Sequence, residues 1–239
     1  MLQSDSKGVS VGVDRHRFLR LLLETSYLLR LIVSMTTFVC ACVLVVYWGT
    51  VAVKARRLAR KIGKDPNVIP RETVGRWMRL IWAPTVAAWC VQPWLAVFGV
   101  GWRTVWLGRL LKPVQPVAVL AAIMGSLLAV VALILTMLCW RRMGLSWRIG
   151  IDPGERTELV VQGPYRLVRH PIYALSILLM LGVVLTIPTA LMLVTAGIHI
   201  IMLQIEARRE ETYLLKIHGP QYGRYKEAVG RFIPRFRVQ

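Results

Sequence analysis

The sequence predicts an all-α, polytopic membrane protein with about five transmembrane helices. Hydrophobic residues make up 56% of the 239 residues and the mean hydropathy is +0.54, which is more apolar than soluble domains of this length usually are. Three stretches, 31–53, 80–100 and 114–140, are almost free of charge and long enough to cross a hydrocarbon core of about 30 Å. The membrane is therefore the predicted solvent for most of the chain.

A fourth apolar region, residues 174–205, is too long for one span unless that span is strongly tilted. Pro188 lies near its middle, close to Thr186 and Thr189. Proline removes a backbone donor and blocks continuation of a helix. We therefore expect two shorter helices that form a hairpin, which brings the number of spans to five. A single kinked span is the alternative.

The placement of basic residues predicts the orientation in the membrane. With five spans, the segments 54–80, 141–171 and 206–239 share one face and carry 23 of the 31 Lys and Arg residues. The positive-inside rule puts this face in the cytoplasm, with the C-terminus, and puts the N-terminus outside. The net charge of +19 is then mostly topological, with attraction to anionic membrane lipids, and nucleic acid is not an expected partner.

The chain divides into three parts by composition. Residues 1–30 form an N-terminal segment, and the broken apolar pattern of residues 18–32 suits an interfacial helix. Residues 31–140 form a three-span membrane scaffold in which ionisable side chains are almost absent from the spans. The basic segment 54–64 between two of these spans is a candidate membrane-surface helix that ends at Gly63. Residues 141–239 form the third part, which carries the polar motifs.

A dense group of Gly, Pro, Tyr, Arg and His occupies residues 163–173, between the long apolar runs. Gly163 and Pro164 mark a turn, and the next five residues are long enough for one or two helical turns. Pro171 biases His170 away from helical geometry. The chain is thus redirected into the next span where backbone groups are left unpaired, which is a natural place to hold a ligand.

Carboxylates follow this group in the last apolar region. His199, Glu206 and Glu210 are separated by seven and four residues, so they lie within roughly 20° and 40° of one direction on a helix. Glu211 lies about 100° away from Glu210. The alternative for the glutamates is a solvated helix with i,i+3 or i,i+4 ion pairs, and the alternative for His199 is a hydrogen-bonded core histidine. The four cysteines show no metal-ligand spacing, so no metal site is predicted.

These motifs together resemble the membrane methyltransferase superfamily that contains the isoprenylcysteine carboxyl methyltransferases and the phospholipid methyltransferases. The resemblance covers roughly residues 143–235, and the N-terminal half is similar only in being transmembrane. The motifs that carry it are Leu159-Val160-x-x-Gly163-Pro164-Tyr165, Arg169-His170-Pro171-x-Tyr173, Arg209-Glu210-Glu211, Gly219-x-x-Tyr222-x-x-Tyr225 and Phe232-Ile233-Pro234.

The resemblance implies an integral membrane enzyme that uses S-adenosyl-L-methionine, with residues 141–239 as the methyltransferase catalytic region. It implies a cofactor pocket on the cytoplasmic side, formed by the C-terminal half. The catalytic candidates are Arg169, His199, Glu206 and Glu210. The cofactor-binding candidates carried over from the family motifs are Thr157, Glu158, Leu159, Val160, Tyr165, His170, Pro171, Ile172, Tyr173, Glu210 and Glu211.

The chemistry of the cofactor agrees with this set, because carboxylates and aromatic faces stabilise a sulfonium and an ammonium group. The acceptor is expected to be a lipid or another lipophilic or membrane-permeant molecule with an amine, thiol or carboxylate. The isoprenylcysteine enzymes have an arginine where this chain has Glu206, which disfavours a carboxylate acceptor. The alternatives are a sterol- or steroid-type membrane reductase that uses a nicotinamide cofactor, and a non-enzymatic membrane scaffold.

Overall fold

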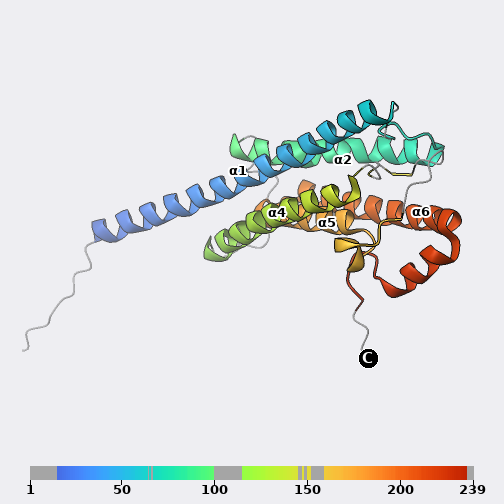
Figure 1. Cartoon of the computed structure of the whole chain (residues 1–239). Helices are drawn as coiled ribbons and strands as arrows, with labels where there is room; N and C mark the ends of the chain where they lie inside the picture. The colour runs from blue at the N-terminus through green and yellow to red at the C-terminus, as the bar shows by residue number, and fades with distance from the viewer. Residues whose placement is uncertain are drawn as a thin grey trace, which may run out of the picture.

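The structure is a computed structural model that describes residues 15–63, 65, 67–99, 115–144, 147, 150–151 and 159–235. Within these ranges it is helical and has no strand, which confirms the predicted all-α fold. One isolated parallel bridge joins Val168 and Gly230. The elements are α1 (Arg15–Ile62), α2 (Thr73–Val97), α4 (Gln115–Met143), the 3₁₀ helix η2 (Gly163–Arg166), α5 (Pro171–Thr186) and α6 (Ala190–Ala228) (Figure 1).

Four helices within the described residues are long and apolar enough to cross a membrane: α1, α2, α4 and α6. This confirms the polytopic membrane protein predicted from the sequence. The remaining predicted span, the fourth along the chain, is the shorter apolar helix α5. Its 16 residues extend about 24 Å, less than the hydrocarbon thickness, because the helix begins at Pro171 and ends at Thr186.

The predicted hairpin in the fourth apolar region is confirmed. Helix α5 ends at Thr186, and α6 begins at Ala190 on the other side of Pro188. Thr189 caps α6, because its side chain accepts a hydrogen bond from the backbone N–H of Met192 at 3.0 Å. A proline and a capping threonine therefore produce the turn, as local sequence chemistry predicts.

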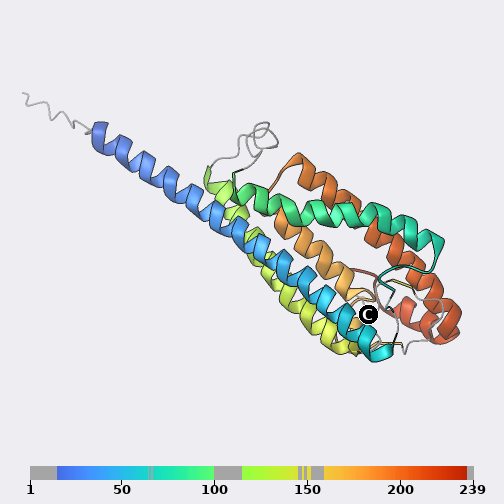
Figure 2. The same cartoon turned by 90° about the horizontal axis from the view of Figure 1, so that it is seen from above.

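Helix α1 joins three segments that the sequence suggested separately. The expected interfacial helix, the first span and the basic segment after it form one helix of 48 residues, about 72 Å long. It ends at Ile62 and is followed by Gly63, which has a φ of +68°. The N-terminal part of α1 extends past the other helices, while its C-terminal part runs beside α4 (Figures 1 and 2).

Helices α4 and α5 approach each other closely where two glycines meet. A Cβ on Gly125 would lie 2.5 Å from the carbonyl oxygen of Gly182, and a Cβ on Gly182 would lie 2.6 Å from that of Gly125. Small residues let membrane helices pack backbone to backbone. This contact sets α5 against α4 and thereby positions the N-terminal end of α5, where the polar motif lies.

The C-terminal part of the chain folds back toward this motif. Helix α6 bends at Gly219, whose φ of +52° and ψ of −131° are not helical, and Pro220 follows. The tail then returns beneath the start of α5 (Figure 1). There the backbone N–H groups of Arg169 and His170 donate to the carbonyl oxygens of Gly230 and Arg231 at 2.8 and 3.1 Å. The bend thus brings the tail alongside the Arg-His-Pro element.

Candidate functional site

A cavity of about 200 Å³ lies where α1, α2, α4, α5, α6 and the loops meet. That volume is more than ten times what one water molecule needs. The described residues that line it are Tyr47, Trp48, Val51, Trp82, Trp140, Met143, Trp147, Gly150, Leu159, Val160, Tyr165, Arg169, His170, Pro171, Ile172, Tyr173, Ser176, Leu203, Glu210, Leu214, Tyr222 and Tyr225. The polar side chains of the lining come from the motifs of the C-terminal half, and we call them the polar lining. Tyr47, Trp48, Trp82 and Trp140 come from the membrane helices α1, α2 and α4, and we call them the aromatic lining.

Glu210 is the carboxylate of the polar lining. Its Oε1 accepts a short hydrogen bond from the Tyr173 hydroxyl, and its Oε2 lies 3.3 Å from Nδ1 of His170. The His170 ring stacks on Tyr173 with an interplanar angle of 3°. Burial lowers the pKa of His170, but hydrogen bonds to Glu210 and Glu211 outweigh it and raise the pKa above its ordinary value. The polar lining therefore combines a carboxylate, an imidazole and a phenol.

Glu211 belongs to a different cluster, which holds the tail. The Arg169 guanidinium donates to Oε1 of Glu211 from Nε and Nη2, at 3.1 and 2.8 Å. Arg231 donates to both oxygens of Glu211 at 2.8 Å. The remaining Arg169 nitrogen, Nη1, donates to the backbone carbonyls of Lys226 and Val229. Arg169 lines the cavity, but each of its nitrogens already has a protein partner.

Several buried polar atoms at the cavity have no partner among the described residues. They are the indole Nε1 of Trp48, the hydroxyls of Tyr165 and Tyr222, and Nε2 of His170, whose nearest carboxylate oxygen is Oε1 of Glu211 at 3.5 Å. Burial raises the pKa of the Tyr165 phenol well above its usual range, so this group is neutral and can donate. Buried polar groups are rarely left without a hydrogen bond. Orphaned donors that converge on a cavity indicate that it holds a polar ligand.

His199 lies behind the cavity wall and does not line the cavity. Its Nδ1 accepts from the Trp82 indole at 3.1 Å, and its Nε2 lies 3.0 Å from the Ser176 hydroxyl. An indole nitrogen can only donate, so the ring is neutral with its proton on Nε2, which donates to Ser176. His199 is fully buried, and its ring contacts Trp89 at 4.9 Å between centroids. Its contacts hold two lining residues, Trp82 and Ser176.

Glu206 also lies outside the main cavity. Arg209 donates to its Oε2 at 2.6 Å and pairs with Glu72 on the other side. Glu206 lines a smaller neighbouring cleft together with Arg79 and Gly150. A Cβ on Gly150 would lie 2.6 Å from Oε1 of Glu206, so the loop backbone packs directly on this carboxylate. These contacts pair Glu206 with a cation and pack the loop against α6.

The structure thus separates the predicted site residues into two groups. His199, Glu206 and Glu211 are buried in polar clusters beside the cavity, and Thr157 and Glu158 lie outside the described residues. The others line the cavity: Leu159, Val160, Tyr165, Arg169, His170, Pro171, Ile172, Tyr173 and Glu210.

Sequence reasoning missed the lining residues of the membrane helices and of the bent part of α6. Tyr222 and Tyr225 belong to the Gly219-x-x-Tyr222-x-x-Tyr225 motif, so their spacing after Gly219 was the available signal. Trp82 and Trp140 stand near predicted span ends, where aromatic residues often mark the membrane interface. That pattern explains their position without a site, and only the packing of α2 and α4 brings them to the cavity.

The comparisons with known proteins agree with these motifs. Residues 120–221 match the family described as phospholipid methyltransferase, a superfamily that includes the isoprenylcysteine carboxyl methyltransferases. Every site residue predicted above falls in this segment, and the predicted resemblance is confirmed. The match supports a membrane methyltransferase. Searches of curated proteins and of solved structures gave no match.

Proposed function

We propose that the protein transfers a methyl group from S-adenosyl-L-methionine to a lipophilic acceptor that carries an amine or a thiol. The observation that supports this most is the mixed lining of the cavity: Glu210 and His170 line it together with membrane-helix aromatics such as Trp48 and Trp82. A water-soluble cofactor and a lipid-soluble acceptor need such different surroundings in one enclosed space. The cavity end of the bundle would then face the cytoplasm, as the basic residues suggest.

The polar lining fits the cofactor by charge and by hydrogen bonding. When bound, S-adenosyl-L-methionine supplies a methyl group on a sulfonium cation. Glu210 would hold a positive group of the cofactor, and the ring of Tyr173 would face a cation. The free hydroxyls of Tyr165 and Tyr222 would donate to its acceptor atoms. Leu159, Val160 and the His170-to-Tyr173 turn would complete the wall.

The aromatic lining fits an acceptor that comes from the membrane. Tyr47 and Trp48 come from α1, Trp82 from α2 and Trp140 from α4, so the wall is built from helices that contact lipid elsewhere. Aromatic walls bury apolar groups and exclude water from the reacting atoms. In-line transfer to an amine or thiol then requires mainly alignment of the acceptor with the methyl group.

The basic side chains at the cavity are already paired with glutamates, which disfavours a carboxylate acceptor. Among the described lining residues, Arg169 and His170 are the basic side chains, and both are paired with glutamates. An acceptor carboxylate would therefore enter without a free partner, which is costly in a buried site. This argument replaces the one from Glu206, because Glu206 lies outside the main cavity and pairs with Arg209.

The test is to incubate the purified protein with methyl-labelled S-adenosyl-L-methionine and three separate acceptor pools. These are membrane lipids with amine headgroups, lipophilic thiols, and prenylcysteine analogues with a free carboxylate. Label in the amine or thiol pool supports the proposal. Label only in the carboxylate pool contradicts the acceptor, and no label together with no cofactor binding contradicts the function.

A further inference from the structure

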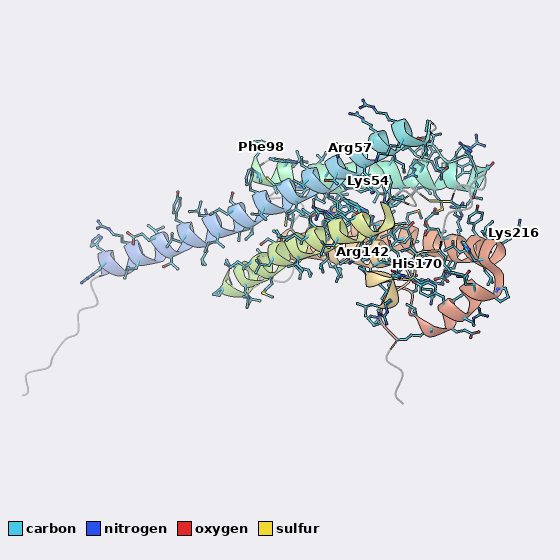
Figure 3. The ribbon with its side chains drawn as sticks, viewed as in Figure 1. Lys54, Arg57, Phe98, Arg142, His170 and Lys216 are labelled. Atoms are coloured by element: carbon cyan, nitrogen blue, oxygen red, sulfur yellow. The ribbon has the colours of Figure 1, made fainter. Side chains whose placement is uncertain are left out.

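A second cleft, of about 570 Å³, lies between the C-terminal ends of α1 and α4. It lies beside the main cavity, and Trp140 is the one described residue that lines both. Figure 3 shows Lys54 and Arg57 on the part of α1 that runs beside α4, while His170 lies at the start of α5. The motifs of the proposed methyltransferase do not reach this cleft, so its features need their own explanation.

The polar lining of this cleft is strongly basic. Lys54, Arg57 and Lys61 follow at intervals of three and four residues, so they share one face of α1, and Arg141 faces them from α4. No described acidic residue lines the cleft. Within the described part of the chain, Arg57, Lys61 and Arg141 form no salt bridge. Like charges this close repel one another, so an anion that bridges them would be stabilising.

The rest of the lining is apolar. Leu58 and Trp140 are buried at the cleft, Met137 is partly buried, and Val53 is 46% exposed on the outer side of α1. Helices α1 and α4 both have the length and composition of membrane spans. A phosphate held by the cations would therefore have an apolar surface next to it, as a lipid with acyl chains requires. Basic pockets between membrane helices bind anionic headgroups in this way.

A simpler explanation for these basic residues is their position at helix ends, since Lys and Arg favour helix C-termini and the inner membrane face. It does not account for Lys54, which lies two turns before the end of α1. Its ammonium group donates to the carbonyl oxygen of Trp140 at 3.3 Å and lies 5.4 Å from the Trp147 ring centroid. These contacts fix a cation at the inner wall of the cleft, which general surface charge does not require.

We propose that this cleft binds the phosphate of an anionic membrane lipid, with Lys54, Arg57, Lys61 and Arg141 as its ligands. The site is separate from the methyl-transfer cavity and does not depend on the proposed function. The chemistry that it recognises is a phosphate monoanion or dianion, which a free phosphate also carries. The apolar floor of Leu58, Met137 and Trp140 favours the lipid.

The test compares two triple variants of the full chain. Arg57→Gln, Lys61→Gln and Arg141→Gln remove three cations from the cleft. Arg56→Gln, Arg60→Gln and Arg142→Gln remove three exposed cations from neighbouring positions on the same two helices that do not line it. Both variants change the net charge equally, so diffuse attraction to the membrane falls equally. Binding of spin-labelled phosphatidylglycerol is measured in phosphatidylcholine nanodiscs.

We expect the wild-type protein and the neighbouring-charge variant to retain the lipid, and the cleft variant to bind it at least about tenfold more weakly, because each cation near the surface contributes severalfold. Equal loss in both variants would overturn the proposal in favour of diffuse attraction. In a second arm, millimolar inorganic phosphate is added to the wild-type protein. Full displacement of the lipid would assign the cleft to free phosphate and also overturn the lipid site.

A folding control keeps the comparison interpretable. Binding of S-adenosyl-L-methionine is measured for both variants, since none of the substituted residues lines the main cavity. Unchanged cofactor binding with lost lipid binding supports a separate lipid site. If the protein binds no S-adenosyl-L-methionine at all, the thermal unfolding temperature replaces this control, and the lipid result stands on its own.

Discussion

Glu210 and Glu211 are neighbours in sequence, but they face different regions of the molecule. Glu210 faces the cavity, and its contacts are one tyrosine and one histidine. Glu211 is 1% exposed and is held by Arg169 and Arg231, with His170 and Lys226 further away. A turn of about 100° along the helix separates a carboxylate available to a ligand from one that is fully used in holding the tail. Charge alone therefore does not show which of two neighbouring carboxylates faces the cavity.

The largest expected effect is on stability, from Glu211→Gln. This change leaves Arg169 and Arg231 without a counter-charge in a buried cluster, which typically costs about 3–5 kcal/mol. We expect a clearly lower thermal unfolding temperature in detergent and faster proteolysis of the tail after residue 229. Glu210→Gln serves as the matched control and is expected to lower the unfolding temperature by less, because it affects only the contacts to Tyr173 and His170. Equal temperatures for the two variants would remove the distinction between the neighbours.

The next effect is on the cofactor, from Glu210→Gln. Loss of one charge-assisted contact costs about 1.5–3 kcal/mol, so the affinity for S-adenosyl-L-methionine should fall by roughly tenfold to a hundredfold. Isothermal titration calorimetry measures it directly. Glu206→Gln is the control from the same helix face, and it should bind the cofactor almost normally because Glu206 pairs with Arg209 outside the cavity. Intact binding in Glu210→Gln would show that the role assignment is wrong.

A smaller, pH-dependent effect comes from His170, which lies between the two glutamates. Its pKa is raised in the folded protein, so its pairing stabilises the fold fully below the ordinary value of about 6.5. This contribution is lost as the pH rises through the folded pKa. The difference in unfolding temperature between the wild-type protein and His170→Gln should therefore shrink from pH 6 to pH 9. A difference that grows with pH would contradict the charged state of His170.

The smallest effect is expected from Ser176→Ala, a lining residue whose hydroxyl contacts His199 behind the cavity wall. It removes the acceptor of the His199 Nε2 proton and costs about 1 kcal/mol. Trp82 would keep its hydrogen bond to Nδ1, so cofactor affinity should change by less than about threefold. Tryptophan fluorescence and calorimetry measure the two quantities. A loss as large as that of Glu210→Gln would mean that Ser176 itself contacts a ligand.

The local features of this chain were predictable because each depends on a few neighbouring residues. Pro188 and Thr189 interrupt the fourth apolar region and cap the next helix, so the hairpin follows from backbone chemistry. The non-helical geometry of His170 follows in the same way from Pro171, with a φ of −123° and a ψ of +66°. The uninterrupted length of α1 was not predicted, since the charges that break its apolar pattern do not break a helix.

The roles of the helix-face residues were decided by tertiary contacts. Periodicity places His199, Glu206 and Glu210 along one stripe of α6, but α2 covers the first two positions. Trp82 reaches His199, and Glu72 reaches the arginine that pairs with Glu206. Of these three residues, only Glu210 lines the cavity. A helix period describes the direction of a side chain and carries no information about which element lies opposite.

The sequence by itself determined the membrane helices, the hairpin and the motif residues around His170 and Glu210, because hydrophobic length, proline and helix period act over short distances. The tertiary structure alone decided the wider surroundings of each carboxylate, since Arg231 reaches Glu211 only after the tail has packed, and Glu72 joins the Arg209–Glu206 pair only after α2 has packed. It also decided that aromatic residues from α1, α2 and α4 complete the cavity. Pairing between distant segments depends on packing, which no local pattern records.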